Sequence, residues 1–334
     1  LSDTEAKLKM IWEEVLNFSP IDIHDNFFEI GGDSILSIQI ISKARKLGVA
    51  ISPNQLFEHQ TIATLGQDIA EKVNQEDKFD FLVPLRKEGA KKPLFCIHSG
   101  GGHVFFYNLL TEYMEEGRPI YALQPSGLDG SKENMHNTIE EMTSDYIMAM
   151  RAVQPEGPYN VLVYCFSATV GNEMAYQLGR ENQDTNIIVM DTMASPWTLN
   201  KPGRFEARAR SFFIRFFKRP VSSIKTFFID RFWRISPVWV RLFGDENQKE
   251  LENLKVNLRK ICLAYEWKEH SGKVSLILTE KPHESLQKVT IDSWKELSPG
   301  GRLDMLYTKG DHRTLFEEPD VRFVAEKIDE AMIE

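Results

Sequence analysis

The sequence is poor in cysteine and has no long apolar run. Its 334 residues include only three cysteines, Cys96, Cys165 and Cys262. They are scattered without the spacing of metal ligands, which argues against a zinc module or a disulfide framework and favours a reducing compartment. No uninterrupted apolar stretch is long enough to span a bilayer. We therefore expect a cytoplasmic protein without a bound metal.

Excess positive charge and nucleotide-binding loops are also missing. The formal net charge is −9, which argues against a general nucleic-acid binder because such proteins present a basic surface to phosphates. The run Gly100-Gly101-Gly102 is not followed by Gly-Lys-Ser/Thr, so it does not read as a phosphate loop. No Gly-x-Gly-x-x-Gly follows a strand, which disfavours a reductase domain.

The pattern of the chain indicates two domains. With 42% hydrophobic residues, it can bury one large core and one small one. Helical periodicity over residues 1–75 gives way to a charged segment at 76–81, which we interpret as a linker. From residue 82 to 334, apolar strands alternate with helical stretches, which predicts a mainly parallel sheet covered by helices. The expected strands are 94–97, 120–123, 161–164, 187–190, 274–278 and 303–307.

Ser34 is the most informative residue of the first domain. It ends the run Phe27-Phe28-Glu29-Ile30-Gly31-Gly32-Asp33-Ser34, in which the two glycines permit a tight turn before a helix. A helix N-terminus favours an attached phosphate, because free backbone N–H groups and the helix dipole both attract an anion. The same Asp-Ser pair could instead serve only as a helix N-cap.

This run resembles the attachment motif of peptidyl carrier domains from nonribosomal peptide synthetases, and the resemblance extends through most of residues 1–75. It implies a small α-helical bundle. It also implies that 4'-phosphopantetheine is attached covalently to Ser34 by a phosphopantetheinyl transferase, and that its thiol carries an acyl or peptidyl thioester. Upstream condensation and adenylation domains would then be partners.

Three expected strands end in residues that could form a nucleophilic site. Ser167 lies where the strand at 161–164 turns into a helix, Asp191 follows the strand at 187–190, and His312 follows the last strand. Their order of nucleophile, acid and base is that of α/β-hydrolases. A histidine would take the proton of the serine hydroxyl, and a carboxylate would hold that histidine in the required tautomer.

Each member of this set has a competitor. Asp311 could replace Asp191 as the carboxylate, although adjacent residues rarely face each other, and Asp304 is weaker because it lies near the start of its strand. Cys165 could replace Ser167, but we expect it to precede the turn by two residues and to point away. The negative oxygen of the tetrahedral intermediate would be held by two backbone N–H groups. We assign these to Ala168 and, by alignment with the family, to Gly100, with Gly101 as the alternative to Gly100.

Residues 82–334 resemble the terminal thioesterase domain of such synthetases. The segments Leu82-Val83-Pro84-Leu85 and Gln154-Pro155-Glu156-Gly157-Pro158-Tyr159 support this outside the triad. The resemblance implies an α/β-hydrolase fold with a helical lid at about 195–270. It further implies that Ser167 accepts the acyl chain from Ser34, and that hydrolysis or cyclisation then releases it.

One departure from the family keeps a second hypothesis open. The usual Gly-x-Ser-x-Gly reads here Cys165-Phe166-Ser167-Ala168-Thr169, so both flanking glycines are absent. A degenerate hydrolase domain that only docks or gates the carrier, and releases nothing, is therefore the alternative.

The expected lid has an unusual composition. Residues 201–241 contain eleven Lys or Arg against Glu206 and Asp230, a net charge of +9, interleaved with phenylalanine pairs. A lid with its apolar face on the substrate channel explains this pattern. Contact with a membrane surface is a second interpretation. Attraction of residues 1–75, which have a net charge of −5, is a third.

Overall fold

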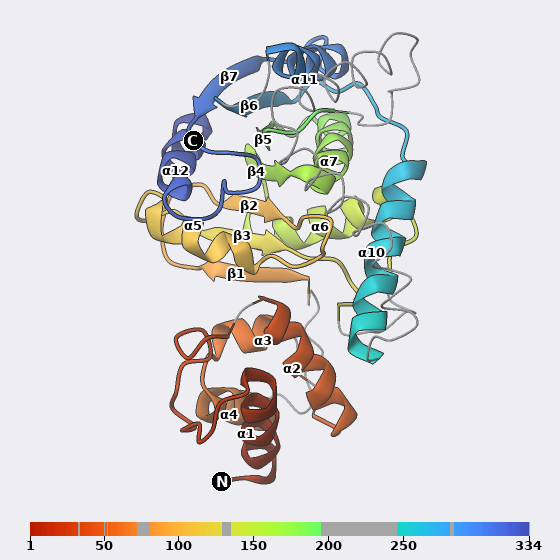
Figure 1. Ribbon diagram of the computed structural model, residues 1–334. Helices are drawn as coiled ribbons and strands as arrows, with labels where there is room; N and C mark the ends of the chain where they lie inside the picture. Colours follow the sequence, from red (N-terminus) through yellow and green to blue (C-terminus); the bar gives the residue numbers. More distant parts are fainter. Residues whose placement is uncertain are drawn as a thin grey trace, which may run out of the picture.

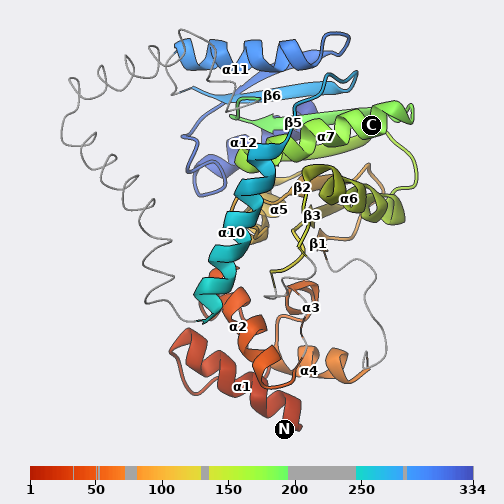
Figure 2. The ribbon, with the colours of Figure 1, turned by 90° about the vertical axis from the view of Figure 1, so that its right-hand side faces the viewer.

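The computed structural model describes residues 1–32, 34–49, 51, 53–71, 81–128, 135–194, 246–280 and 284–333. The expected linker at 76–81 falls almost entirely outside these residues, as does the basic segment at 201–241. Figures 1 and 2 show a small helical part at the N-terminus and a larger part built around a sheet.

The described residues of the N-terminal part form a bundle of four helices. They are α1 (Asp3–Leu16), α2 (Ser34–Lys46), α3 (Pro53–Glu58) and α4 (Ile62–Glu71). A capping box starts α1, because the Ser2 hydroxyl accepts the N–H of Glu5 while the Glu5 carboxylate accepts the N–H of Ser2. Trp12 and Phe27 are fully buried in the core of the bundle, with ring centroids 5.0 Å apart. The expected helical bundle is thus present.

A seven-stranded sheet forms the centre of the larger part. Its strands are β1 (Leu82–Arg86), β2 (Leu94–Ile97), β3 (Ile120–Leu123), β4 (Tyr159–Tyr164), β5 (Thr185–Met190), β6 (Lys273–Thr279) and β7 (Leu303–Thr308). The order across the sheet is β1-β3-β2-β4-β5-β6-β7, and among these described strands only β1 runs antiparallel to its neighbour. All six strands expected from the sequence are confirmed, and β1 is an additional one.

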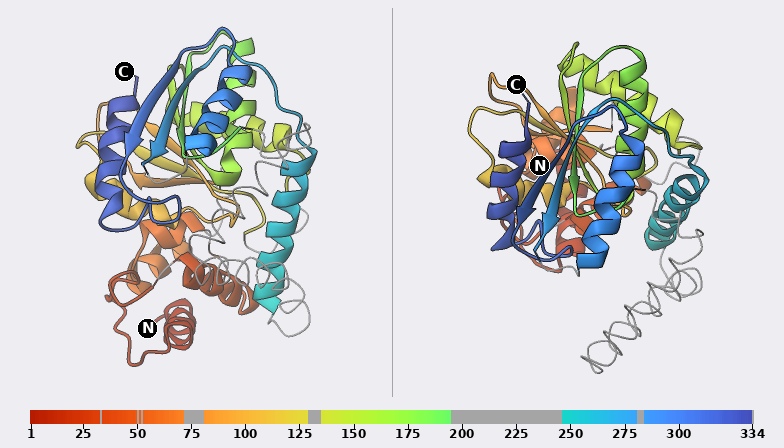
Figure 3. Two further views of the ribbon diagram at one scale, coloured as in Figure 1. Left: turned by 45° about the horizontal axis from the view of Figure 1, so that its top comes forward. Right: turned by 90° about the horizontal axis from the view of Figure 1, so that it is seen from above.

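Helices cover both faces of this sheet, as Figure 3 shows. One face packs under α6 (Ile139–Val153), α7 (Ala168–Arg180), α10 (Glu246–Ala264) and α11 (Glu284–Leu297). The other packs under η1 (Phe105–Tyr107), α5 (Asn108–Tyr113) and α12 (Asp320–Ala331). Successive strand residues point to opposite faces, so Val161 and Val163 join the first core while Leu162 joins the second.

The helical bundle lies against the β1 end of the sheet (Figure 1). Helix α3 contacts β1, and Glu58 pairs with Lys87 at 2.6 Å. The ring of Phe28 lies 6.0 Å from that of Phe105 in η1, centroid to centroid. The loop that leads to Ser34 therefore contacts the larger part close to its sheet. None of the described helices combines the length and apolarity needed to cross a membrane.

Candidate active site

Three side chains that can carry acid–base and nucleophilic chemistry meet at one edge of the sheet. Cys165 directly follows β4, Asp191 directly follows β5, and His312 lies in the loop after β7. These strands are parallel neighbours or near neighbours, so their carboxyl ends meet at the same edge, where open α/β sheets form their sites.

The structure brings Asp191 and His312 together. Oδ2 of Asp191 lies 3.2 Å from Nδ1 of His312, and the N–H of Thr279 donates to its Oδ1 at 3.2 Å. Asp191 adopts a positive φ of 43°, a conformation that aspartate tolerates better than most residues. Because Nδ1 is engaged by the carboxylate, Nε2 is the nitrogen left to act on a reacting group.

The competing carboxylates lie elsewhere. Asp311 accepts the backbone N–H of Arg313, two residues on, and closes a local turn. Asp304 lies near the start of β7 and pairs with Arg302 and Lys273. Of the three candidates, Asp191 is the one whose carboxylate contacts the imidazole of His312.

Cys165 occupies the sharp turn between β4 and α7. It is exposed, with a φ of 59°, the strained geometry that lifts a nucleophile above an α/β-hydrolase sheet. Its N–H donates to Oγ1 of Thr192 at 2.9 Å, and the Thr192 hydroxyl donates to the carbonyl of Met190. These bonds tie the turn to the end of β5, and the thiol is one of the groups that raise the pKa of His312.

Ser167 lies beneath the turn. Its side chain is fully buried, and Oγ accepts the N–H of Tyr164 at 2.8 Å and donates to the carbonyl of the same residue at 3.0 Å. The expectation that the turn exposes the Ser167 hydroxyl is therefore wrong. So is the expectation that Cys165 precedes the turn and points away. The physical reason is that the sharp turn starts directly after β4, which ends at Tyr164 as expected, so Cys165 is the first residue of the turn and Ser167 its last, just before α7.

The surroundings of His312 favour its protonated form. Burial of the ring opposes protonation, but the hydrogen bonds and negative charges of Asp191 and Cys165 outweigh it and raise the pKa of His312 to about 9.

Tyr164 holds the loop of His312 in place. Its hydroxyl donates to the backbone carbonyl of His312 at 2.5 Å, and the two rings lie 4.8 Å apart.

The loop after β2 approaches the residue that follows Cys165. A Cβ added to Gly100 would lie 3.5 Å from the Cβ of Phe166, and the ring of His98 stacks on that of Phe166. Burial lowers the pKa of His98 to about 3, so this imidazole is neutral. A Cβ added to Gly101 would lie 3.2 Å from the ring of His103. The glycine loop therefore borders the turn through Gly100.

Ala168 is the first residue of α7. Its N–H donates to the carbonyls of Cys165 and Phe166, and its side chain is 2% exposed. This N–H is thus engaged within the start of the helix, whereas the N–H of Phe166 is the one directly after the exposed thiol.

Ser34 is the first residue of α2, as the sequence predicted. No acidic residue lies in the first turn of this 13-residue helix, so no carboxylate there opposes a phosphate at the positive end of the helix dipole. Gly31 adopts a φ of 104°, and a Cβ at Gly32 would lie 2.5 Å from the Phe27 ring. Both glycines are required by the turn that precedes Ser34.

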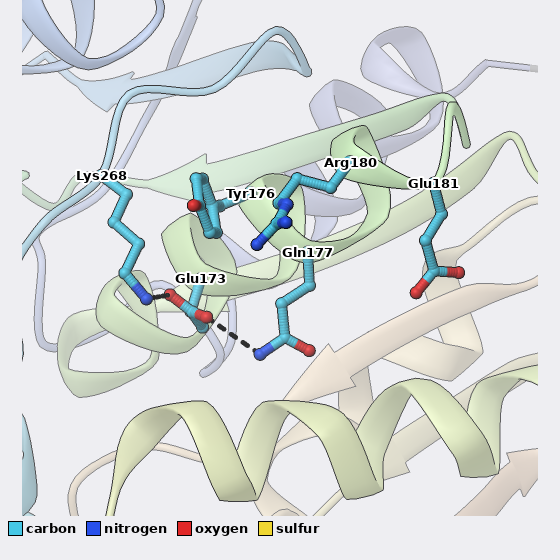
Figure 4. A pocket seen from close by; sticks show the side chains of 6 residues that line it. All are labelled: Glu173, Tyr176, Gln177, Arg180, Glu181 and Lys268. Atoms are coloured by element: carbon cyan, nitrogen blue, oxygen red, sulfur yellow. Dashed lines mark hydrogen bonds and ion pairs between the residues drawn. The ribbon is translucent and has the colours of Figure 1, made fainter.

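A pocket lies beside α7, away from the edge site (Figure 4). It has a volume of about 550 Å³ and is lined by Glu173, Tyr176, Gln177, Arg180, Glu181 and Lys268. Glu173 is 2% exposed and accepts hydrogen bonds from Lys268 at 2.7 Å and from the Tyr265 hydroxyl at 2.9 Å. These paired charges fasten the segment after α10 to α7, and the pocket contains none of the residues of the edge site.

The sequence contained a signal that could have identified Cys165. The strand residues Val161, Leu162 and Val163 are fully buried, and the half-buried Tyr164 ends the strand. A turn that starts directly after this apolar run places Cys165, not Ser167, at its apex. The contributions of Tyr164 and Thr192 carry no such local signal, because they depend on contacts with a loop and a strand end that are distant in sequence.

The sheet order, the turn after β4 and the acid–base pair at the strand edge define an α/β-hydrolase-like fold. Two family models match the chain: the phosphopantetheine attachment site over residues 6–69 and the thioesterase domain over residues 92–209. The chain therefore joins a carrier domain, of the kind that binds 4'-phosphopantetheine covalently, to a thioesterase domain. This architecture is typical of the terminal module of nonribosomal peptide synthetases.

Relatives with known names agree with this assignment. The chain is 36% identical over 195 residues to malpibaldin synthetase of Mortierella alpina, which covers 58% of this chain and 4% of that protein. It is also 38% identical over 181 residues to a dimodular nonribosomal peptide synthase of Bacillus subtilis (strain 168). That alignment covers 54% of this chain and 8% of the synthase. The chain thus spans less than a tenth of either relative.

Solved structures share the fold. The four-domain nonribosomal peptide synthetase AB3403 aligns with 98% of this chain and 26% of its own, with a TM-score of 0.58 and 25% identity. The NocB thioesterase domain aligns with 75% of this chain and 98% of its own, with a TM-score of 0.54 and 20% identity.

Proposed function

We propose that this chain is the terminal module of a nonribosomal peptide synthetase, and that Cys165, rather than Ser167, receives the acyl chain before its release. One observation carries the proposal: Cys165 is exposed at a strained turn at the same edge of the sheet as the His312–Asp191 pair, and its thiol is among the groups that raise the pKa of His312. Nucleophile, base and orienting carboxylate form the arrangement that acyl transfer requires.

The carrier part would receive its prosthetic group on Ser34 from a phosphopantetheinyl transferase. Support comes from the position of Ser34 at the N-terminus of α2, where the helix dipole favours a phosphate. When attached, the group supplies a thiol that holds the acyl chain as a thioester. Upstream condensation and adenylation domains would supply that chain.

Acylation would begin with transfer of the Cys165 proton to Nε2 of His312. The resulting thiolate attacks the thioester carbonyl, and the protonated imidazole then gives its proton to the departing thiol. Asp191 holds the imidazole through Nδ1 throughout. We assign the oxyanion donors to the N–H of Phe166 and the N–H of Gly100, because the loop approaches Phe166 closely and the N–H of Ala168 is engaged in its helix.

Release would follow when a second nucleophile attacks the acyl-enzyme. His312 accepts the proton of that nucleophile and returns it to the sulfur of Cys165. Water gives an acid, and a nucleophile within the acyl chain gives a ring. The fixed position of His312, held by Asp191 and by the Tyr164 hydroxyl, supports its role in both steps.

The assignment is tested by loading the carrier with an acyl thioester and following the intact protein by mass spectrometry. In the wild type we expect an acyl adduct on Cys165, followed by release. Cys165→Ala should form no adduct and should retain the loaded carrier. Ser167→Ala should still form the adduct, since its hydroxyl bonds only the backbone of Tyr164 among the contacts described for it.

An adduct on Ser167, or release by Cys165→Ala at the wild-type rate, would refute the assignment of Cys165. If the wild type kept its thioester as long as Cys165→Ala does, the domain would release nothing. The alternative hypothesis, a domain that only docks or gates the carrier, would then hold. Two relatives carry the names inactive atromentin synthetase invA4 and invA6, of Paxillus involutus, so this outcome is a meaningful one to test.

A further inference from the structure

Two of the three cysteines lie at the start of α7. Cys165 precedes this helix and is exposed, whereas Cys262 reaches it from α10 and is half-buried. We propose that peroxide joins their two sulfurs in a reversible disulfide, which inactivates the edge site until a thiol reductant opens it. The inference concerns the regulation of that site, and it rests on the proposed function because it takes Cys165 as the reactive thiol.

Helix α10 holds Cys262 against the first turn of α7. Sγ of Cys262 lies 3.9 Å from Oγ1 of Thr169, four residues after Cys165. The same hydroxyl donates to the carbonyl of Phe166 at 2.8 Å, and Phe166 directly follows Cys165. A single threonine side chain therefore connects the second thiol to the residue next to the first.

The same helix also contacts the loops on the other side of the turn. A Cβ added to Gly102 of the glycine loop would lie 3.2 Å from Cδ2 of Leu254, and Nδ2 of Asn257 donates to the carbonyl of His136 at 2.9 Å. Helix α10 thus extends from the glycine loop to the start of α7. A bond between Cys262 and Cys165 would remove the nucleophile and also fasten this helix to the turn.

The surroundings of the two thiols give them different roles. Cys165 is exposed, so peroxide can reach it, and the protonated imidazole of His312 can supply the proton that the departing hydroxide needs. Burial, together with the charge of Cys165, raises the pKa of Cys262. Cys262 is therefore the slower of the two to react with peroxide.

Oxidation of Cys165 prepares Cys262 for the second step. A sulfenic acid on Cys165 no longer carries the negative charge that helps to raise the pKa of Cys262. The thiolate of Cys262 then forms more easily, next to the sulfur that it attacks. Transient disulfides of this kind, which sense oxidants, are the ones found in reducing compartments.

Both steps balance with hydrogen peroxide as the oxidant. The sulfur of Cys165 attacks one peroxide oxygen, so a sulfur–oxygen bond forms, the oxygen–oxygen bond breaks and hydroxide leaves as water with a proton from His312. Cys262 then attacks the sulfenic sulfur, so a sulfur–sulfur bond forms and the sulfur–oxygen bond breaks. The second hydroxide leaves as water with the proton of the Cys262 thiol. Two thiols are oxidised to one disulfide, and one peroxide is reduced to two waters.

The experiment treats the full chain with hydrogen peroxide, stops the reaction with acid, alkylates the remaining thiols after denaturation and maps the modified peptides by mass spectrometry. Acyl transfer from the loaded carrier is measured before treatment, after treatment and after addition of dithiothreitol. Cys96 is the internal control, since it is fully buried in β2 and burial raises its pKa. Cys262→Ser is the matched variant, because it removes only the second thiol.

In the wild type we expect a peptide that joins Cys165 to Cys262, an alkylated Cys96, and a loss of acyl transfer that dithiothreitol reverses. Cys262→Ser should transfer the acyl chain at the wild-type rate before treatment. Prolonged peroxide should then add oxygen irreversibly to Cys165 in this variant, and dithiothreitol should restore about fivefold less activity than in the wild type.

Oxygen added to Cys165 of the wild type without a link to Cys262 would overturn the inference. A disulfide that joins two molecules would also overturn it, as would recovery of Cys262→Ser that equals that of the wild type. The proposed function fails separately. A disulfide in a protein whose reduced form never gains an acyl group on Cys165 would contradict that function and leave the disulfide in place.

Discussion

At the scale of single residues, Tyr164 links the strand that ends at Cys165 to the loop that carries His312. Its hydroxyl donates to the backbone carbonyl of His312, and its ring contacts both that imidazole and the ring of Phe316. One side chain therefore holds the proposed base, His312, near the strand end that carries the proposed nucleophile, Cys165. We regard Tyr164 as a positioning residue, because its contact is with the backbone of the base.

Replacement of this tyrosine by phenylalanine tests the positional role. Tyr164→Phe keeps the ring and removes one hydrogen bond, which is worth about 0.5–1.5 kcal/mol. We expect kcat to fall about 2- to 10-fold with KM little changed. The control is Tyr159→Phe at the other end of β4, whose hydroxyl donates to the carbonyls of Gln154 and Pro155. An equal loss of kcat in both variants would contradict the role of Tyr164.

The raised pKa of His312 predicts how acylation depends on pH. The protonated imidazole is needed to protonate the departing thiol, so kcat/KM should fall about tenfold per unit as the pH rises beyond about 9. A stopped assay of acyl transfer at pH 7 to 10.5 measures this limb. A descending limb centred near pH 7 would mean that Cys165 and Asp191 do not act together on this histidine.

The same shift has a consequence for stability. The folded-state pKa of His312 lies above its ordinary value of about 6.5. Its interactions therefore stabilise the fold fully below about pH 6.5, and this contribution is lost as the pH rises through about 9. The difference in unfolding free energy between wild type and His312→Gln should shrink over that interval, as urea titrations at pH 6 and pH 9.5 can measure.

At the scale of elements, the buried Glu173 fastens α7 to the segment that follows α10. Lys268→Met removes the cation that contacts Glu173 at 2.7 Å and leaves a buried carboxylate. Breaking a buried ion pair lowers the free energy of unfolding by about 3–5 kcal/mol. We expect a loss of about 2 kcal/mol here, because the side chain of Lys268 is 27% exposed. Lys91→Met, which removes an exposed partner of Glu115, is the control and should cost under about 1 kcal/mol.

Denaturant titration of both variants measures these losses. If Lys268→Met lowers the free energy of unfolding no more than Lys91→Met does, the prediction is contradicted. The carboxylate of Glu173 would then become protonated or rehydrated at little cost in free energy.

The contact between the two domains makes a separate prediction. Phe28 of the carrier packs near Phe105, which follows the glycine loop of the thioesterase. Phe28→Ala should slow acyl transfer from the carrier several-fold, because the loop before Ser34 loses its apolar contact. The same variant should hydrolyse a small acyl-thiol substrate at the wild-type rate, since no residue of the edge site changes. Loading of Ser34 is checked by mass, and equal slowing of both reactions would contradict a docking role.

At the scale of the whole molecule, local patterns were sufficient for the architecture. Apolar runs alternating with helical stretches predicted six strands, and the positions of Asp191 and His312 after two of them predicted that both would lie at the ends of strands of one sheet. The proposed nucleophile could not be placed in the same way. The strand end at Tyr164 was predicted, but Ser167 was taken as the nucleophile from its likeness to the family motif, and the sequence alone does not show that its hydroxyl turns back to the backbone of Tyr164. Strand β1 was missed because Pro84 interrupts its pattern.

That proline also bears on how the protein should be handled. Strand β1 is an outer strand, and a proline there removes one hydrogen-bond donor from an edge that could otherwise pair with another molecule. Helix α3 contacts the same strand. A thioesterase excised at residue 81 would leave this edge without its covering helix. We therefore expect the excised thioesterase to aggregate more readily than the two domains produced as one polypeptide.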